Sequence, residues 1–191
     1  MANPQNPRLQ SLTPLGHDQA EIATIGPVTI AETLTFALAS LPSRKGREAE
    51  VAAIAATNSI PLPGPGKAGA APIYGAIWLG PDQWMIQAPQ TSHEDITAIL
   101  KPIFGDAASI TEQTDAWVRF DVTAPDLPRL FERLCNFDLH RHGPGSATRT
   151  VIDHLGCYII HRAGNAVTIL GPRSSAHALH HALITAARSA F

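Results

Sequence analysis

Histidine is the residue type that most suggests chemistry in this 191-residue chain, which contains nine of them. Imidazole nitrogens are common zinc ligands. His177 and His181 are four residues apart, so both could face one ion from a single helix, and further donors precede them at His140, His142, His154, Cys157 and His161. No carboxylate or cysteine stands at a standard spacing for a third ligand. We therefore predict surface or interface histidines and no metal site, while a metal on His177 and His181 stays an open alternative.

A glycine-rich segment could instead bind phosphate, because glycines let backbone N–H groups approach phosphate oxygens. The segment reads GPGKAG over residues 64–69. A Walker A loop has an earlier glycine where this chain has Pro61, and Ser or Thr where this chain has Ala68. No strong strand pattern leads into the segment. We predict no nucleotide site here and no cofactor-binding residue elsewhere in the chain.

The candidate nucleophiles each have a simpler structural interpretation. Cys157 shares one face of an alternating pattern with Ile159, and Cys135 ends an apolar helical stripe, so both thiols are expected to be reduced core residues. Ser174 and Ser175 stand where a helix N-cap is expected. The aspartates are scattered over turns and strand faces: Asp121, Asp126, Asp138 and Asp153. We predict no catalytic residue in this chain.

Composition excludes several classes of partner. The chain has 14 Lys and Arg residues against 16 Asp and Glu, a formal net charge of −2, and only 16% charged residues. Nucleic acid and anionic membranes are therefore not expected as partners. The longest apolar runs, such as Val51–Ala56, are far shorter than a membrane span, and Met1–Gly16 lacks the apolar stretch of a secretory signal. We expect a soluble cytoplasmic protein.

Apolar spacing predicts four helices. One follows Thr91 and has apolar residues at positions 96, 99, 100, 103 and 104; Thr91 and Glu94 form a candidate capping box, and Gly105 is a candidate stop. A second helix is predicted over 127–135, after Pro125, a residue type that suits a first turn. The third is predicted over 174–190, and a weaker one over 47–56.

Strands are predicted between the helices. Residues 73–79 and 83–88 flank a Gly-Pro-Asp turn, and residues 157–162 and 166–170 flank Ala-Gly-Asn, so each pair is expected to form a hairpin. Residues 148–152 precede the second hairpin and complete a three-stranded meander. Residues 117–122 alternate between apolar side chains at even positions and other types at odd positions, as in a strand with one face on a core. This alternation leaves Trp117 on the opposite face, where we expect it to contact a partner.

The order of these elements repeats along the chain. A hairpin, a proline and an amphipathic helix occur at Ile73–Phe104 and again at Cys157–Ala190. We therefore predict an α+β fold of antiparallel hairpins plus helices in two pseudo-duplicated halves. Residues 60–72, rich in Pro, Gly and Ala, are expected to form a surface loop or an arm that docks on a partner. Residues 1–20 are expected to form a flexible N-terminal arm, and residues 21–191 a single domain.

Several stretches resemble one known family. They read TEQTDAWVRF (111–120), ATRTVIDHLGCY (147–158), WLGPDQW (78–84), LFERLCN (130–136) and LGPRSS (170–175). The similarity extends in family order from the region of Leu38 to the C-terminus. On these residues the chain resembles the gamma subunit of bacterial heterotetrameric sarcosine oxidase.

The resemblance implies two interlocked halves, as in the folate-binding domain of glycine-cleavage aminomethyltransferase. It also implies an accessory, non-catalytic subunit that assembles with alpha, beta and delta subunits, chiefly with alpha. FAD, FMN, NAD, tetrahydrofolate and zinc are then expected on those partners and not on this chain. The complex would demethylate sarcosine to glycine, form peroxide and pass the one-carbon unit to tetrahydrofolate. The alternative is a freestanding folate-binding or aminomethyltransferase-like protein.

Overall fold

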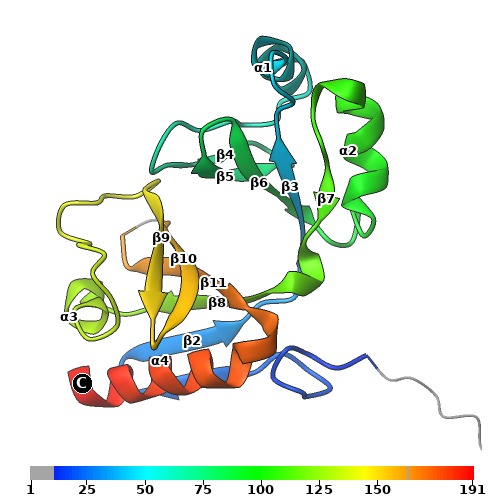
Figure 1. The fold of residues 1–191 in the computed structure, drawn as a ribbon. Helices are drawn as coiled ribbons and strands as arrows, with labels where there is room; N and C mark the ends of the chain where they lie inside the picture. Colours follow the sequence, from blue (N-terminus) through cyan, green and yellow to red (C-terminus); the bar gives the residue numbers. More distant parts are fainter. Residues whose placement is uncertain (1–10, 163) are drawn as a thin grey trace, which may run out of the picture.

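The computed structural model describes residues 11–162 and 164–191, which form two antiparallel β-sheets with helices on their outer sides (Figure 1). Six strands of this part of the chain form one sheet, in the order β1-β2-β8-β11-β10-β9: Ile22–Ile25, Val28–Glu32, Trp117–Thr123, Ala166–Pro172, Leu155–His161 and Ala147–Ile152. Five more form the other, in the order β4-β5-β6-β3-β7: Ala68–Ala70, Gly75–Gly80, Gln83–Pro89, Phe36–Pro42 and Thr111–Glu112. The predicted hairpins and meander are confirmed.

Helices cover the outer face of each sheet. The α-helices are α1 (Glu48–Thr57), α2 (Ile96–Phe104), α3 (Leu127–Phe131) and α4 (Ala176–Ala190). Three short 3-10 helices adjoin them: η1 (Gly105–Ala107), η2 (Thr114–Ala116) and η3 (Arg173–Ser175). Figure 1 shows α1 and α2 beside the five-stranded sheet, and α3 and α4 beside the six-stranded sheet. All four predicted helices are therefore present, and α3 is shorter than its apolar stripe predicts.

The chain contains two repeats that exchange their first strands. The first repeat runs β3-α1-β4-β5-β6-α2, and the second runs β8-α3-β9-β10-β11-α4. Strand β2 precedes the first repeat but pairs with β8 of the second, and β7 precedes the second repeat but pairs with β3 of the first. Glu32 of β2 thus lies opposite Phe120, as Glu112 of β7 lies opposite Ala39. The predicted pseudo-duplication and interlocking of the two halves are confirmed.

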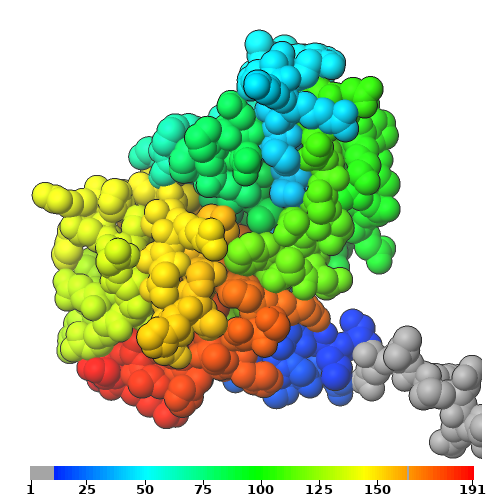
Figure 2. All heavy atoms as spheres, viewed as in Figure 1, coloured from blue at the N-terminus to red at the C-terminus, as the bar shows by residue number. Residues whose placement is uncertain are grey.

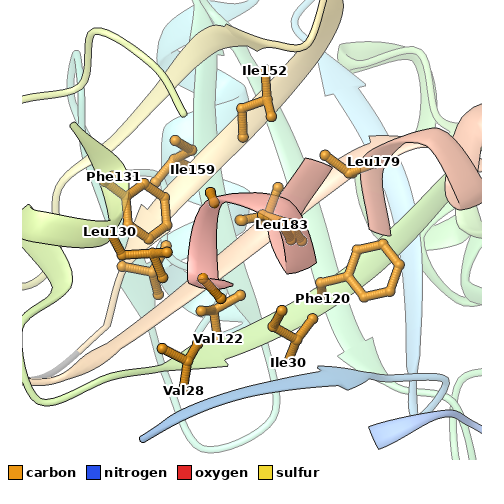
Figure 3. Close-up of a cluster of buried hydrophobic side chains, with 14 of the residues drawn as sticks. Val28, Ile30, Phe120, Val122, Leu130, Phe131, Ile152, Ile159, Leu179 and Leu183 are labelled. Carbon is orange, nitrogen blue, oxygen red and sulfur yellow. The ribbon is translucent and has the colours of Figure 1, made fainter. Parts of the chain in front are cut away.

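Three apolar cores follow from this arrangement. One lies between the six-stranded sheet and helices α3 and α4, and Figure 3 shows Phe120, Phe131 and Leu183 among its side chains. A second lies between the five-stranded sheet and helices α1 and α2. The third joins the two sheets and contains Phe36, Leu38, Ile77, Met85, Ala147, Tyr158 and Leu170. The two repeats accordingly form one contiguous body in the space-filling view (Figure 2).

The core between the sheets includes part of the Trp117 side chain. The Trp117 ring packs edge-on against Tyr158 of β10, with centroids 5.4 Å apart and an interplanar angle of 64°. Its indole Nε1 is buried and has no hydrogen-bond partner in the described part of the chain. Trp117 therefore packs in part within the molecule, because the second sheet lies over the face that the alternation leaves open, and it also lines an open cavity. Its contact with a partner stays a prediction.

Two helix starts also differ from the predictions. Asp95, and not Thr91, is the N-cap of α2, where its carboxylate accepts a hydrogen bond of 2.9 Å from the Ala98 N–H. Asp126 caps α3 in the same way, so Pro125 lies before the helix and not in its first turn. In both cases an aspartate supplies an acceptor for a helical N–H: Asp95 lies four residues after Thr91, and Asp126 directly follows Pro125. The predicted stop at Gly105 is confirmed, with φ of 49°.

The segment at residues 60–72 is a surface loop over most of its length, as predicted, and backbone pairing holds it in place. It contains β4, which pairs with β5. The Ala68 N–H donates to the Gly145 carbonyl, and the Ala147 N–H donates to the Gly66 carbonyl, each at 2.9 Å. These bonds connect the segment to the start of β9, the edge strand of the other sheet.

The predicted N-terminal arm falls only in part within the described residues, because residues 1–10 lie outside them. Residues 11–20 include Leu15, which is 2% exposed and packs in the core beneath α4. Figure 2 shows this N-terminal segment against the part of the chain that leads into α4. The proposed boundary at residue 20 stays a prediction.

Candidate functional site

The polar face of β8 carries the most unusual group of side chains in the molecule. Val118, Phe120 and Val122 point into the core beneath α4, so the strand's alternation places Arg119 and Asp121 on the face toward the five-stranded sheet. Arg119 is only 7% exposed. A guanidinium that is nearly buried is stable only where charge and hydrogen bonds compensate its lost hydration.

Asp121 supplies that compensation. Its carboxylate accepts hydrogen bonds from Arg119 Nε at 3.0 Å and from Arg119 Nη2 at 2.9 Å. Thr33 Oγ1 donates to the same carboxylate at 3.0 Å, and Thr168 Oγ1 of β11 donates to it as well. The Arg162 guanidinium lies 3.9 Å away. These five residues form what we call the Asp121 network, which contains two positive charges and one negative charge.

The pKa of Asp121 reflects two opposing effects. Burial disfavours the charged carboxylate and acts to raise its pKa. The hydrogen bonds and charge of Arg119 oppose this effect, with help from Thr168 and Arg162, and the net result is a pKa below the ordinary value. Asp121 is therefore a permanent anion at neutral pH that positions Arg119, and it is unsuited to accept or donate a proton in catalysis.

Arg119 also forms the boundary between two cavities. Its guanidinium lies over the Phe36 ring, 5.1 Å from the ring centroid. Both residues line a cavity of about 430 Å³ beside β5 and β6, which we call the first cavity, and a second cavity of about 320 Å³ beside η2 and the N-terminal segment. The Nη1 atom of Arg119 makes no hydrogen bond to any described residue.

The histidines singled out in the sequence do not gather around one point. His177 and His181 are exposed on α4, whereas His180, between them, is buried and stacks on Phe120. His161 is buried on β10, and its Nδ1 lies 2.6 Å from the backbone carbonyl of His142. No group of three metal-ligating side chains occurs within the described residues.

The two cysteines lie in the core around β9 and β10. Cys157 is fully buried, and burial raises the pKa of its thiol to about 11. Cys135 is half-buried, and its thiol pKa is raised for the same reason. A thiol with a raised pKa is mostly protonated at neutral pH and is a poor nucleophile. Both residues pack with the core beneath α4, as the alternation and helical spacing predict.

A second buried charge, Glu32, has no signal in the sequence patterns. It is 4% exposed at the end of β2, where its carboxylate accepts 3.1 Å hydrogen bonds from the N–H groups of Leu15 and Glu21. Glu21 in turn lies 3.1 Å from His17 and 3.9 Å from His180. This arrangement connects the N-terminal segment to α4 and is structural in character.

The comparisons with known proteins concern the fold. No family model and no curated protein matches the sequence. Among solved structures, one match is a chain of heterotetrameric sarcosine oxidase from Corynebacterium sp. U-96 in complex with pyrrole 2-carboxylate. The match covers 88% of this chain and 88% of that chain, with a TM-score of 0.74 and 20% sequence identity. Glycine cleavage system aminomethyltransferase T from Bartonella henselae matches 82% of this chain with a TM-score of 0.57 and 14% identity.

These matches define the class of fold. The chain shares its two-sheet α+β architecture with aminomethyltransferase T, of which it covers 48%. The match to the sarcosine oxidase chain is more extensive, because it covers 88% of both chains. Within the described residues, no helix is long and apolar enough to cross a membrane.

Proposed function

We propose that this chain is an accessory, gamma-type subunit of a heterotetrameric sarcosine oxidase complex in the cytoplasm. The observation that carries the proposal is the match over 88% of both chains to a component of such a complex. The chemistry of the described side chains is consistent with a non-catalytic role. The Asp121 carboxylate accepts hydrogen bonds from several neighbouring donors, and the cysteine thiols have raised pKa values.

In this proposal the redox chemistry belongs to the partner subunits. FAD, FMN, NAD, tetrahydrofolate and zinc are bound by the alpha, beta and delta subunits, and the alpha subunit provides the main contact for this chain. The assembled complex oxidises sarcosine to glycine, forms peroxide and transfers the one-carbon unit to tetrahydrofolate. In the proposal, this chain stabilises the complex by binding the other subunits, chiefly the alpha subunit.

Co-expression tests the proposal directly. A tagged form of this chain, expressed with the alpha, beta and delta subunits from the same genome, is expected to co-purify with them as a yellow complex. Omitting this chain is expected to lower the yield or the thermal stability of the flavin-containing subunits. A tagged chain that purifies alone from the co-expressing cells contradicts the proposal.

Two edge strands offer matched variants for locating the interface. Ile22 of β1 is 67% exposed and Val151 of β9 is 58% exposed, and these strands form opposite edges of the six-stranded sheet. A lysine at either position leaves the cores intact, because neither side chain is buried. The edge at which lysine abolishes co-purification is the edge that contacts a partner.

The second candidate is a freestanding aminomethyltransferase-like protein that binds folate. It is favoured by the similarity to aminomethyltransferase T over 82% of this chain. Calorimetry of the isolated chain with tetrahydrofolate separates the two candidates. Binding well below millimolar concentration favours the second one, and absence of binding together with complex formation favours the accessory subunit.

A further inference from the structure

We propose that the first cavity, between Arg119 and the β5-β6 hairpin, binds a small monocarboxylate with a flat apolar or aromatic body. The cavity has a volume of about 430 Å³, within the range of small-molecule sites. This inference concerns the isolated chain and does not depend on its assembly with other subunits.

The charge of the cavity favours an anion. Arg119 is the only charged side chain among the described residues that line it. The positive charge of Arg119 is not fully cancelled, because Asp121 is shared between Arg119 and Arg162. The second cavity differs, since Asp18 and Asp115 line it together with Arg119 and Arg173. An anionic ligand is therefore expected in the first cavity and not in the second.

The Arg119 guanidinium is already oriented for a ligand. Its Nε and Nη2 atoms are held by Asp121, and one face lies on Phe36, so the side chain has little rotational freedom left to lose on binding. Nη1 has no hydrogen-bond partner among the described residues. A nearly buried guanidinium whose Nη1 has no partner among the described residues is a strong donor to a carboxylate oxygen.

The rest of the lining suits a polar head on an apolar body. Gln87 contributes an amide, and its side chain lies across Gly75 so closely that a Cβ on Gly75 would be 2.4 Å from Gln87 Nε2. Tyr74 contributes an aromatic wall, and its hydroxyl lies 3.1 Å from His93 Nε2. The remaining wall is mostly apolar: Phe36, Ala70, Ala71, Ile73, Ala88 and Pro89.

Benzoate is the probe, and its neutral analogue benzamide is the control. The amide resonances of the ¹⁵N-labelled full chain are followed during titration at constant ionic strength. Benzoate binding is expected to saturate, with shifts concentrated at residues 73–75 and at residues 87 and 88, and benzamide is expected to bind at least tenfold more weakly. Shifts that do not saturate, equal affinity for the two probes, or shifts centred on Asp115 in the second cavity overturn the proposal.

Two variants test the site without relying on one change. Ala71→Trp fills the cavity from a half-buried position that is not part of the Asp121 network, and it is expected to abolish benzoate binding. Ala53→Trp, on the exposed face of α1, is the matched control and is expected to bind as the parent does. Arg119→Lys keeps the charge, loses the planar fork, and is expected to weaken binding at least threefold. Unchanged binding in the folded Ala71→Trp variant overturns the proposal even where Arg119→Lys fails to fold.

Discussion

Arg119 and Asp121 lie two residues apart on β8, and their side chains share two hydrogen bonds of 3.0 and 2.9 Å. Positions i and i+2 of a strand face the same side of its sheet, so the pair is formed within one strand. Thr33 and Thr168 then connect this pair to the segment after β2 and to β11. One carboxylate thus organises three neighbouring segments on the face between the sheets.

Asp121→Asn is expected to destabilise the chain by about 3 kcal/mol, because it leaves the nearly buried Arg119 without its counter-charge. Urea unfolding at neutral pH measures this loss. Asp115→Asn is the matched control, since Asp115 is 88% exposed and its ion pair with Arg173 spans 3.6 Å. A change within about 0.5 kcal/mol is expected for the control. Equal effects of the two variants would show that Asp121 does not organise this face.

Glu32→Ala is expected to cost about 2 kcal/mol, because the N–H groups of Leu15 and Glu21 lose their acceptors. Amide hydrogen exchange is expected to accelerate at Leu15 and Glu21 well before the rest of the six-stranded sheet is affected. Glu112→Ala is the control from the corresponding place in the other repeat, where the side chain is exposed and accepts from the Thr114 N–H. If exchange at Leu15 stays slow in Glu32→Ala, Glu32 does not hold the N-terminal segment.

His180 is expected to make the chain less stable as the pH falls below about 6.5, the ordinary pKa of histidine. Burial lowers the pKa of His180 in the folded state; Glu21 and Glu32 oppose this effect, and His177 and His17 add to it. The unfolded chain therefore takes up a proton at a higher pH than the folded chain does, and stability is lost through that window.

Unfolding free energies at pH 7.5 and 5.5 measure the contribution of His180, compared between the parent and His180→Gln. The variant is expected to lose less stability than the parent over this interval, whereas His140→Gln, at an exposed position that does not act on the pKa of His180, is expected to follow the parent closely. Identical losses in the parent and His180→Gln would contradict a lowered pKa at His180.

Gly171→Ala is expected to destabilise the chain by about 1 to 3 kcal/mol through overpacking. A Cβ at Gly171 would lie 2.3 Å from Leu179 Cδ2, so β11 and α4 could not keep their present separation. Gly80→Ala is the control on another strand, because no described atom lies within 4 Å of its added Cβ. Thermal unfolding compares the two variants, and a neutral Gly171→Ala would mean that Leu179 can move aside.

Sequence patterns predict the second repeat best, because its strands and α4 carry unbroken alternation or helical spacing. They miss β2 and β7, the two strands that are exchanged between the repeats, and also β3, with which β7 pairs. Strand β3 is buried along most of its length, so it has no alternating pattern to detect. Among the strands of the described residues, the two-residue β7 pairs with β3 alone. A strand that is stabilised mainly by pairing with a strand distant in the sequence has little pattern of its own in the sequence.

The Asp121 network illustrates the same limit for a site. Asp121 is one of four aspartates that look equivalent in the sequence, and only the fold brings Thr33, Thr168 and Arg162 to its carboxylate. Alternation on β8 does place Arg119 and Asp121 on one face. Trp117 illustrates what alternation alone cannot predict. The pattern places Trp117 on the face opposite the core beneath α4, but it does not predict that a second sheet partly covers that face.

Native mass spectrometry of the co-expressed subunits tests the central claim most directly. The proposal predicts one species that contains this chain once, together with one copy each of the alpha, beta and delta subunits, with the flavins retained on the partners. The Ile22 and Val151 lysine variants provide internal controls, because one of them should lower the proportion of that species. Intact flavin-containing assemblies that never include this chain, alongside free folded monomer, would contradict the assignment as an accessory subunit.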